Sequence, residues 1–163
     1  MKIETKYIQS STGHEVIAVW EDCDVFPDEI RNAVRSVTAI CFSGESMVLV
    51  KDERGWHPAS GGREEGETPE ETLIREVKEE SNMKILKYIP LGFMKTDSDG
   101  KIGYQARYYC EVEPYGPFVS DPAGDVTEIK LIDKKDYKKD FDWGVTFERI
   151  MERVEEIRGN KKI

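Results

Sequence analysis

Apolar and β-branched residues along the chain fall into short runs, which are separated by turns and by stretches of helical spacing. In the C-terminal stretch, 143–158, the side chains of Phe147, Ile150 and Val154 share one face of a predicted helix. A short helix is also predicted at 28–34. The order of strands, helix, strands and helix predicts an α/β fold, with helices packed on a mixed β-sheet. Strands are predicted at 15–20, 37–42, 47–50, 85–96, 102–112 and 128–132.

A further helix is predicted to begin after Thr68. The side chain of Thr68 can cap the helix, Pro69 suits its first position, and Glu71 completes a capping box. Asn82 tolerates a left-handed backbone and can end the helix. The preceding segment, 55–68, is rich in glycine, and we expect it to be a shaped loop.

The composition is that of a folded, acidic chain of 163 residues, with 24 Lys and Arg, 33 Asp and Glu, and a net charge of −9. No apolar run reaches the roughly 20 residues that span a bilayer, and the first residues lack the apolar segment of a secretory signal. Three scattered cysteines do not indicate a disulfide framework, so we expect a cytoplasmic protein. The negative charge opposes broad binding to nucleic acid or anionic membranes, but it allows an anionic ligand held through a metal ion.

The helix after Thr68 carries three carboxylates in one sector. At 100° per residue, Glu76, Glu79 and Glu80 fall within about 100° of one another, and Arg75 flanks them. Like charges this close repel each other, so a cation must offset them. Arg75 is one such cation, and a divalent metal is the stronger candidate, because Mg²⁺ and Mn²⁺ prefer hard oxygen ligands. With the glycine-rich loop, the pattern indicates metal-assisted chemistry on a phosphate anhydride; a solvated acidic face is the simpler alternative.

The stretch from Gly61 to Met83 resembles the Nudix box, Gly-x5-Glu-x7-Arg-Glu-apolar-x-Glu-Glu-x-Gly-apolar. The one departure is Asn82, which stands where the family has glycine, and both residue types tolerate a positive φ. Just upstream, Ala59 and Ser60 replace the Pro-Gly that the family often shows. The matching residues are Gly61, Glu67, Arg75, Glu76, Val77, Glu79, Glu80 and Met83.

The resemblance implies a Nudix-type α/β/α sandwich, with a mixed β-sheet, the Nudix helix and a C-terminal helix. We expect one domain over 1–163 with a core at about 35–158. Residues 1–35 would be an N-terminal extension: either extra strands over the substrate site or a contact in a homodimer.

The resemblance also implies roles for individual residues. The metal ligands would be Glu76, Glu79, Glu80 and the backbone of Gly61; Glu79, Glu80 and Arg75 would take part in catalysis; Glu67, Val77 and Asn82 would be structural. Beside the glycine-rich loop, His57, Ser60 and Arg63 are candidates for substrate contact.

The general base is left open between a glutamate of the box and a carboxylate from the later loop 121–125 or the strand behind it. In the second case the candidates are Asp125 and Glu128. Glu128 is preferred, because a strand end positions a side chain better than a loop tip does.

The implied reaction is Mg²⁺- or Mn²⁺-dependent hydrolysis of a pyrophosphate bond in a nucleoside diphosphate derivative. Family members that act on ADP-ribose tend to have proline 15–16 residues past the box, and those that act on dinucleoside polyphosphates have tyrosine near position 17. Ser98, Asp99 and Gly100 stand at these positions, which favours a nucleoside triphosphate, ordinary or oxidised. Two alternatives stay open: a nucleotide-sensing module on the same fold, and a pyrophosphohydrolase of RNA 5′ ends.

Overall fold

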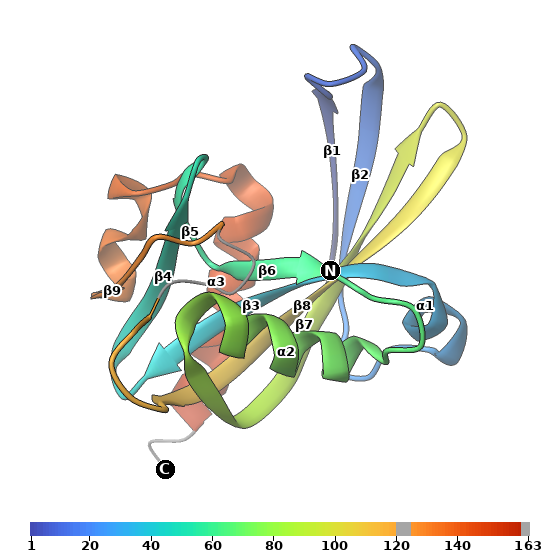
Figure 1. Cartoon of the computed structure of the whole chain (residues 1–163). Helices are drawn as coiled ribbons and strands as arrows, with labels where there is room; N and C mark the ends of the chain where they lie inside the picture. The colour runs from blue at the N-terminus through green and yellow to red at the C-terminus, as the bar shows by residue number, and fades with distance from the viewer. Residues whose placement is uncertain (120–124, 161–163) are drawn as a thin grey trace.

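A mixed β-sheet lies between two long helices, α2 on one face and α3 on the other, in the computed structural model of this chain (Figure 1). The structure describes residues 1–119 and 125–160. In that part of the chain the strand order is β1-β2-β7-β8-β3-β4-β5, with β6 paired to β3 and β9 to β4. β3 and β8 are parallel, whereas the other pairs are antiparallel. The predicted α/β/α sandwich is confirmed.

The elements have the following bounds: β1 Lys2–Ile8, β2 Glu15–Asp22, α1 Asp28–Ala33, β3 Val34–Ser43, β4 Ser46–Asp52, β5 Gly55–His57, β6 Ala59–Gly62, α2 Pro69–Ser81, β7 Met83–Ser98, β8 Lys101–Pro114, β9 Glu128–Ile132, the 3₁₀ helix η1 Lys134–Lys139, and α3 Gly144–Asn160.

Two apolar layers hold the helices on the sheet, and β3 contributes to both because successive side chains of a strand point to opposite faces. Val37 and Ala39 pack in the layer under α2, whereas Ile40 and Phe42 pack in the layer under α3. The helices supply Leu73 and Val77 to the first layer and Phe147, Ile150 and Val154 to the second.

The N-terminal strands extend the sheet. β1 pairs with β2, and β2 pairs with β7, so the β1–β2 hairpin stands beside the β7–β8 hairpin (Figure 1). Asp22 at the end of β2 accepts a hydrogen bond of 2.6 Å from Arg149 of α3, which ties the added strands to the core. Residues 1–35 thus contain extra strands, and the two roles considered for them, a place over the substrate site or a contact in a homodimer, stay predictions.

The local predictions for α2 hold in detail. Thr68 and Glu71 form the capping box, and Pro69 is the first residue of the helix. Asn82 ends the helix with φ 53° and ψ 42°, the left-handed conformation that was expected.

The prediction of a loop over 55–68 is wrong for its first half. Gly55–His57 forms β5 against β4, and Ala59–Gly62 forms β6 against β3. Backbone pairing with these long strands overrides the weak strand preference of a glycine-rich segment.

Among the described residues, no helix is both long and apolar enough to cross a bilayer.

Candidate active site

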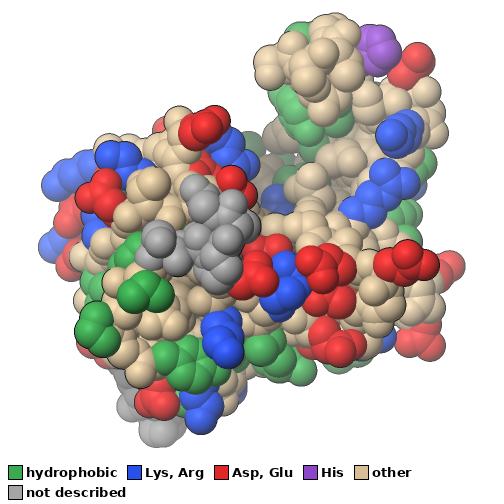
Figure 2. Space-filling model, viewed as in Figure 1, with side chains coloured by type: hydrophobic (Ala, Val, Ile, Leu, Met, Phe, Trp, Pro, Cys, Tyr) green, Lys and Arg blue, Asp and Glu red, His purple; other side chains and the backbone are tan. Residues whose placement is uncertain are grey.

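A cavity of about 1140 Å³ joins α2 to the sheet. It starts at the carboxylates of α2, passes β6 at Ser60 and Gly61, and reaches β3 and β8; Asp125, just before β9, also lines it. Figure 2 shows acidic and basic side chains gathered in the middle of the viewed face, where α2 lies in Figure 1. The volume is large enough for a nucleotide, because small-molecule sites usually measure about 300–1,000 Å³.

Arg75 is the centre of a hydrogen-bond network at this end of the cavity. Its guanidinium donates to both carboxylate oxygens of Glu67, at 2.8 and 2.9 Å, and to the carbonyl of Gly62 at 2.9 Å. It also donates to Glu76 at 2.8 Å and to Glu79 at 3.3 Å. The bond from Arg75 lowers the pKa of Glu67 from 4.5 to about 2, and the same contact raises the pKa of Arg75. The pair therefore stays charged and fixes the position of the neighbouring carboxylates.

Strand β6 lies directly against the other carboxylates. The buried Glu80 accepts a hydrogen bond of 2.7 Å from the backbone amide of Ser60. Gly61 leaves room for Glu76, since a β-carbon on Gly61 would lie 2.0 Å from the Cδ atom of Glu76. The backbone of β6 thus packs closely against the acidic face of α2 at Ser60 and Gly61.

The chemistry of these residues fits a hard divalent cation, because every donor is an oxygen and the missing side chain of Gly61 opens the space beside Glu76. The described residues nonetheless contain no group of three or more His, Cys, Asp and Glu side chains that is close enough to hold an ion. Instead, Arg75 contacts both Glu76 and Glu79. In this arrangement Arg75 supplies positive charge to Glu76 and Glu79, whereas Glu80 accepts from the backbone amide of Ser60.

The structure does not support the choice of Glu128 over Asp125 as the candidate base. Glu128 is 58% exposed, pairs with Lys51 at 3.3 Å and lies outside the cavity lining. The cause is the register of β9, in which Glu128 stands opposite Lys51 of β4. Asp125 lines the cavity, as does Thr127. Residues 121–124 of the same loop lie outside the described residues.

His57, a candidate for substrate contact, does not line the cavity. The ring is buried, with Nε2 at 2.8 Å from Asp52 and Nδ1 at 2.8 Å from the carbonyl of Pro58. β5 pairs with β4 and turns the ring inward. The neighbouring Asp52 and Arg54 line the cavity, whereas His57 does not.

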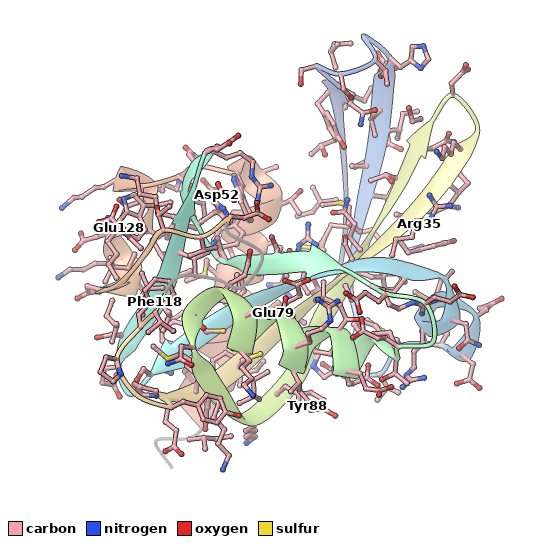
Figure 3. The ribbon with its side chains drawn as sticks, in the orientation of Figure 1. Arg35, Asp52, Glu79, Tyr88, Phe118 and Glu128 are labelled. Atoms are coloured by element: carbon pink, nitrogen blue, oxygen red, sulfur yellow. The ribbon has the colours of Figure 1, made fainter. Side chains whose placement is uncertain are left out.

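The other two candidates for substrate contact lie in different places. Ser60 lines the cavity, next to the metal-binding candidates. Arg63 turns away from it and donates to the backbone carbonyls of Arg31 at 3.4 Å and Asn32 at 3.0 Å, where it links the segment after β6 to α1. Figure 3 labels Glu79 on α2 and Glu128 at the start of β9.

Sequence reasoning missed the part of the cavity that β8 supplies. Gln105 and Arg107 line it together with Ser36 and Thr38 of β3. A usable signal was present: Gln105 and Arg107 alternate with the buried Ala106 and Tyr108, so two polar side chains share one face of an otherwise apolar strand.

Comparison with known proteins agrees with this geometry. The family model for the NUDIX domain matches residues 32–149. Among solved structures, a variant of the Bacillus subtilis pyrophosphohydrolase BsRppH superposes with a TM-score of 0.63 at 21% identity, over 80% of this chain and 78% of that one. A NUDIX hydrolase from Nitrosomonas europaea superposes with a TM-score of 0.59 at 18% identity, over 78% of this chain and 90% of that one. No curated protein matches the sequence.

A third structure, a NUDIX-family hydrolase from Clostridium perfringens, gives a TM-score of 0.58 at 18% identity, over 75% of this chain and 96% of that one. At these identities the structural likeness shows the shared fold alone. The family model carries the assignment, because it covers more than half of the sequence and includes the whole α2 box. The chain therefore belongs to the Nudix family.

Proposed function

We propose that this protein uses Mg²⁺ or Mn²⁺ to hydrolyse a pyrophosphate bond in a nucleoside diphosphate derivative, with a nucleoside triphosphate, ordinary or oxidised, as the first candidate. One observation carries the proposal: Glu76, Glu79 and Glu80 line the same cavity as the backbone of β6 at Ser60 and Gly61. Hard oxygen donors beside an open space are suited to a metal that works together with substrate phosphates.

In this proposal Glu76, Glu79, Glu80 and the backbone carbonyl of Gly61 hold the metal. When bound, the ion stabilises charge on phosphate oxygens and makes a water more acidic. Arg75 keeps Glu76 and Glu79 in place through the bonds described above, and it is itself held by Glu67. The water oxygen attacks phosphorus, the anhydride P–O bond breaks, and a carboxylate at the cavity takes the proton of the water.

The substrate class is supported by the size of the cavity and by the residues after the box. About 1140 Å³ accommodates a nucleoside with a chain of phosphates. Ser98, Asp99 and Gly100 carry neither the proline nor the tyrosine that accompanies the ADP-ribose and dinucleoside polyphosphate subclasses. The net charge of −9 opposes binding of a long polyanion, and for this reason we place a small nucleotide ahead of a long RNA.

The proposal is tested by measuring phosphate and pyrophosphate release with Mg²⁺ or Mn²⁺ over a panel of substrates. The panel contains ordinary and oxidised nucleoside triphosphates, ADP-ribose, nucleotide sugars, and capped or triphosphorylated RNA. Turnover of a triphosphate should fall at least ~10²-fold in Glu79→Gln and in Glu80→Gln. Glu113→Gln, a change of the same type at an exposed position near the end of β8, should leave the turnover of the triphosphate unchanged.

Each other outcome has a defined meaning. Preferred turnover of triphosphorylated RNA would identify the enzyme as a pyrophosphohydrolase of RNA 5′ ends. Tight nucleotide binding without turnover of any panel member would identify a sensing module and would contradict the proposal. Activity within a few-fold of wild type in both glutamine variants would remove Glu79 and Glu80 from the mechanism.

A further inference from the structure

Two rows of polar residues cross the sheet at the floor of the cavity. In the first row, Arg107 of β8 stands opposite Thr38 of β3, which in turn stands opposite Ser60 of β6. In the second row, Gln105 stands opposite Ser36, which stands opposite Gly62. All six residues line the cavity. The rows end on β6, where the Ser60 amide binds Glu80 of the metal-binding candidates.

This polar floor lies on the face of the sheet that α3 covers elsewhere. Tyr109, two residues after Arg107, and Ile40, two residues after Thr38, pack in the apolar layer under α3. The side chains of Arg107 and Thr38 share that face, because residues two apart in a strand point the same way. Core packing therefore does not account for an arginine at this position. The side chain of Arg107 instead lines the cavity.

Arg107, which is partly exposed where it lines the cavity, has no carboxylate partner in the part of the chain that the structure describes. Among the described residues, no carboxylate lies within ion-pair distance of its guanidinium, and its side chain donates a hydrogen bond of 2.9 Å to Gln105. Burial lowers the pKa of Arg107 from 12.5 to about 10, because removal of water disfavours the charged form. By contrast, Arg54 and Arg75 on the cavity wall are both paired with carboxylates. A partly desolvated guanidinium without a carboxylate partner is stabilised by an anion that enters the cavity.

We propose that Arg107, supported by Gln105, binds a phosphate oxygen of the substrate at the sheet end of the cavity, away from the metal-binding carboxylates. Two strand spacings place the Cα atoms of Arg107 and Ser60 about 10 Å apart, a span that a chain of phosphates can bridge. The planar guanidinium can give two parallel hydrogen bonds to phosphate. The inference rests on the proposed function for the identity of the ligand, and its test needs no turnover.

The test is a binding measurement by titration calorimetry with Mg²⁺, using two probes: an α,β-methylene nucleoside triphosphate, which resists hydrolysis, and inorganic tripolyphosphate. Arg107→Gln should weaken the binding of both probes by about 10- to 100-fold, because it removes a charged hydrogen-bonding partner. Arg107→Lys keeps the charge but loses the paired geometry, so its loss should be smaller. Arg35→Gln, an exposed arginine on β3 outside the cavity lining (Figure 3), is the matched control and should bind both probes normally.

Thermal unfolding separates this function from a structural role. Because Arg107→Gln removes a partly desolvated charge that no carboxylate of the described residues offsets, its Tm should equal or exceed that of the wild type. A lower Tm, or binding of both probes within two-fold of wild type, overturns the proposal. A loss of affinity confined to the nucleoside triphosphate, with normal tripolyphosphate binding, also overturns the proposal, because Arg107 would then contact the nucleoside rather than the phosphates. If the wild-type protein binds both probes but hydrolyses no panel substrate, the proposed function fails while the role of Arg107 is still decided.

Discussion

Gly61 faces Glu76 so closely that a β-carbon on Gly61 would lie 2.0 Å from the Cδ atom and 2.1 Å from Oε1 of Glu76. Only glycine leaves the carboxylate where it is. The colliding group is the far end of a flexible side chain, so a larger residue would move the carboxylate and leave the backbone in place. The position of Glu76, one of the metal-binding candidates, therefore depends on which residue stands at position 61.

Gly61→Ala is therefore expected to weaken the binding of Mn²⁺ by about 10-fold or more, as displacement of groups around a metal site commonly does. The Tm should change by no more than about 2 °C, because Glu76 can swing toward solvent. Calorimetric titration with Mn²⁺ and thermal unfolding measure the two effects.

Gly62→Ala is the matched control for this substitution. The nearest atom to a β-carbon at Gly62 is the carbonyl oxygen of Arg35 at 3.9 Å, an ordinary contact. This variant should bind Mn²⁺ as the wild type does. Equal metal affinity in all three proteins would show that Glu76 does not hold the ion.

Asn82 gives a prediction about stability. Its φ of 53° suits glycine and asparagine, and its side chain donates a hydrogen bond of 3.0 Å to the carbonyl of Pro117. Asn82→Gly eases the backbone but loses that exposed bond, so the free energy of unfolding should change by less than about 1 kcal/mol. Asn82→Val should lose about 1–3 kcal/mol, because a β-branched residue resists positive φ. Urea unfolding of both variants decides the matter; equal stabilities would contradict the argument.

The features of α2 could be predicted from sequence because they are local. The cap by Thr68, the turn at Asn82 and the sector shared by Glu76, Glu79 and Glu80 depend on residues within a few positions of one another. The long strands β7 and β8 were also predictable, because both are rich in apolar residues and they follow one another in the chain, joined by the turn at Asp99 and Gly100.

The misplaced residues depend on pairing between distant segments. Glu128 points to Lys51 because β9 adds to β4 in one register, and a shift by one residue would turn it to the other face. His57 is buried because β5 folds back on β4. Arg107 reaches the cavity only because β8 lies parallel to β3, a pairing that no local pattern reveals.

Asp52 predicts how stability depends on pH. Burial alone would raise the pKa of Asp52, but hydrogen bonds from Arg54 and His57 outweigh it and bring the pKa from 3.8 to about 2. Because the folded-state pKa lies below the unfolded one, the carboxylate contributes stability above about pH 4 that is lost as the pH falls toward about 2. Asp52→Asn should therefore cost roughly 2 kcal/mol at pH 7 and much less near pH 2.

Urea unfolding of wild type and Asp52→Asn between these pH values measures the difference directly. Other carboxylates titrate in the same range in both proteins, so the difference between the two curves isolates Asp52. A difference that stays constant with pH would mean that the contacts of Asp52 with Arg54 and His57 do not depend on its charge.

The last prediction concerns the general base. Asp125 lines the cavity that also contains Glu79 and Glu80, whereas Glu128 is held outside it by Lys51. A base must come within hydrogen-bond reach of the attacking water, directly or through a second water, so position favours Asp125. Asp125→Asn should lower kcat by about 10²-fold with little change in KM, and it should remove the acid limb of the pH profile of kcat/KM. Glu128→Gln, the control of the same type three residues away, should leave both kcat and the limb unchanged. If the limb persists in Asp125→Asn and kcat stays near normal, the proton goes instead to a glutamate of the α2 box, because Glu76, Glu79 and Glu80 line the same cavity.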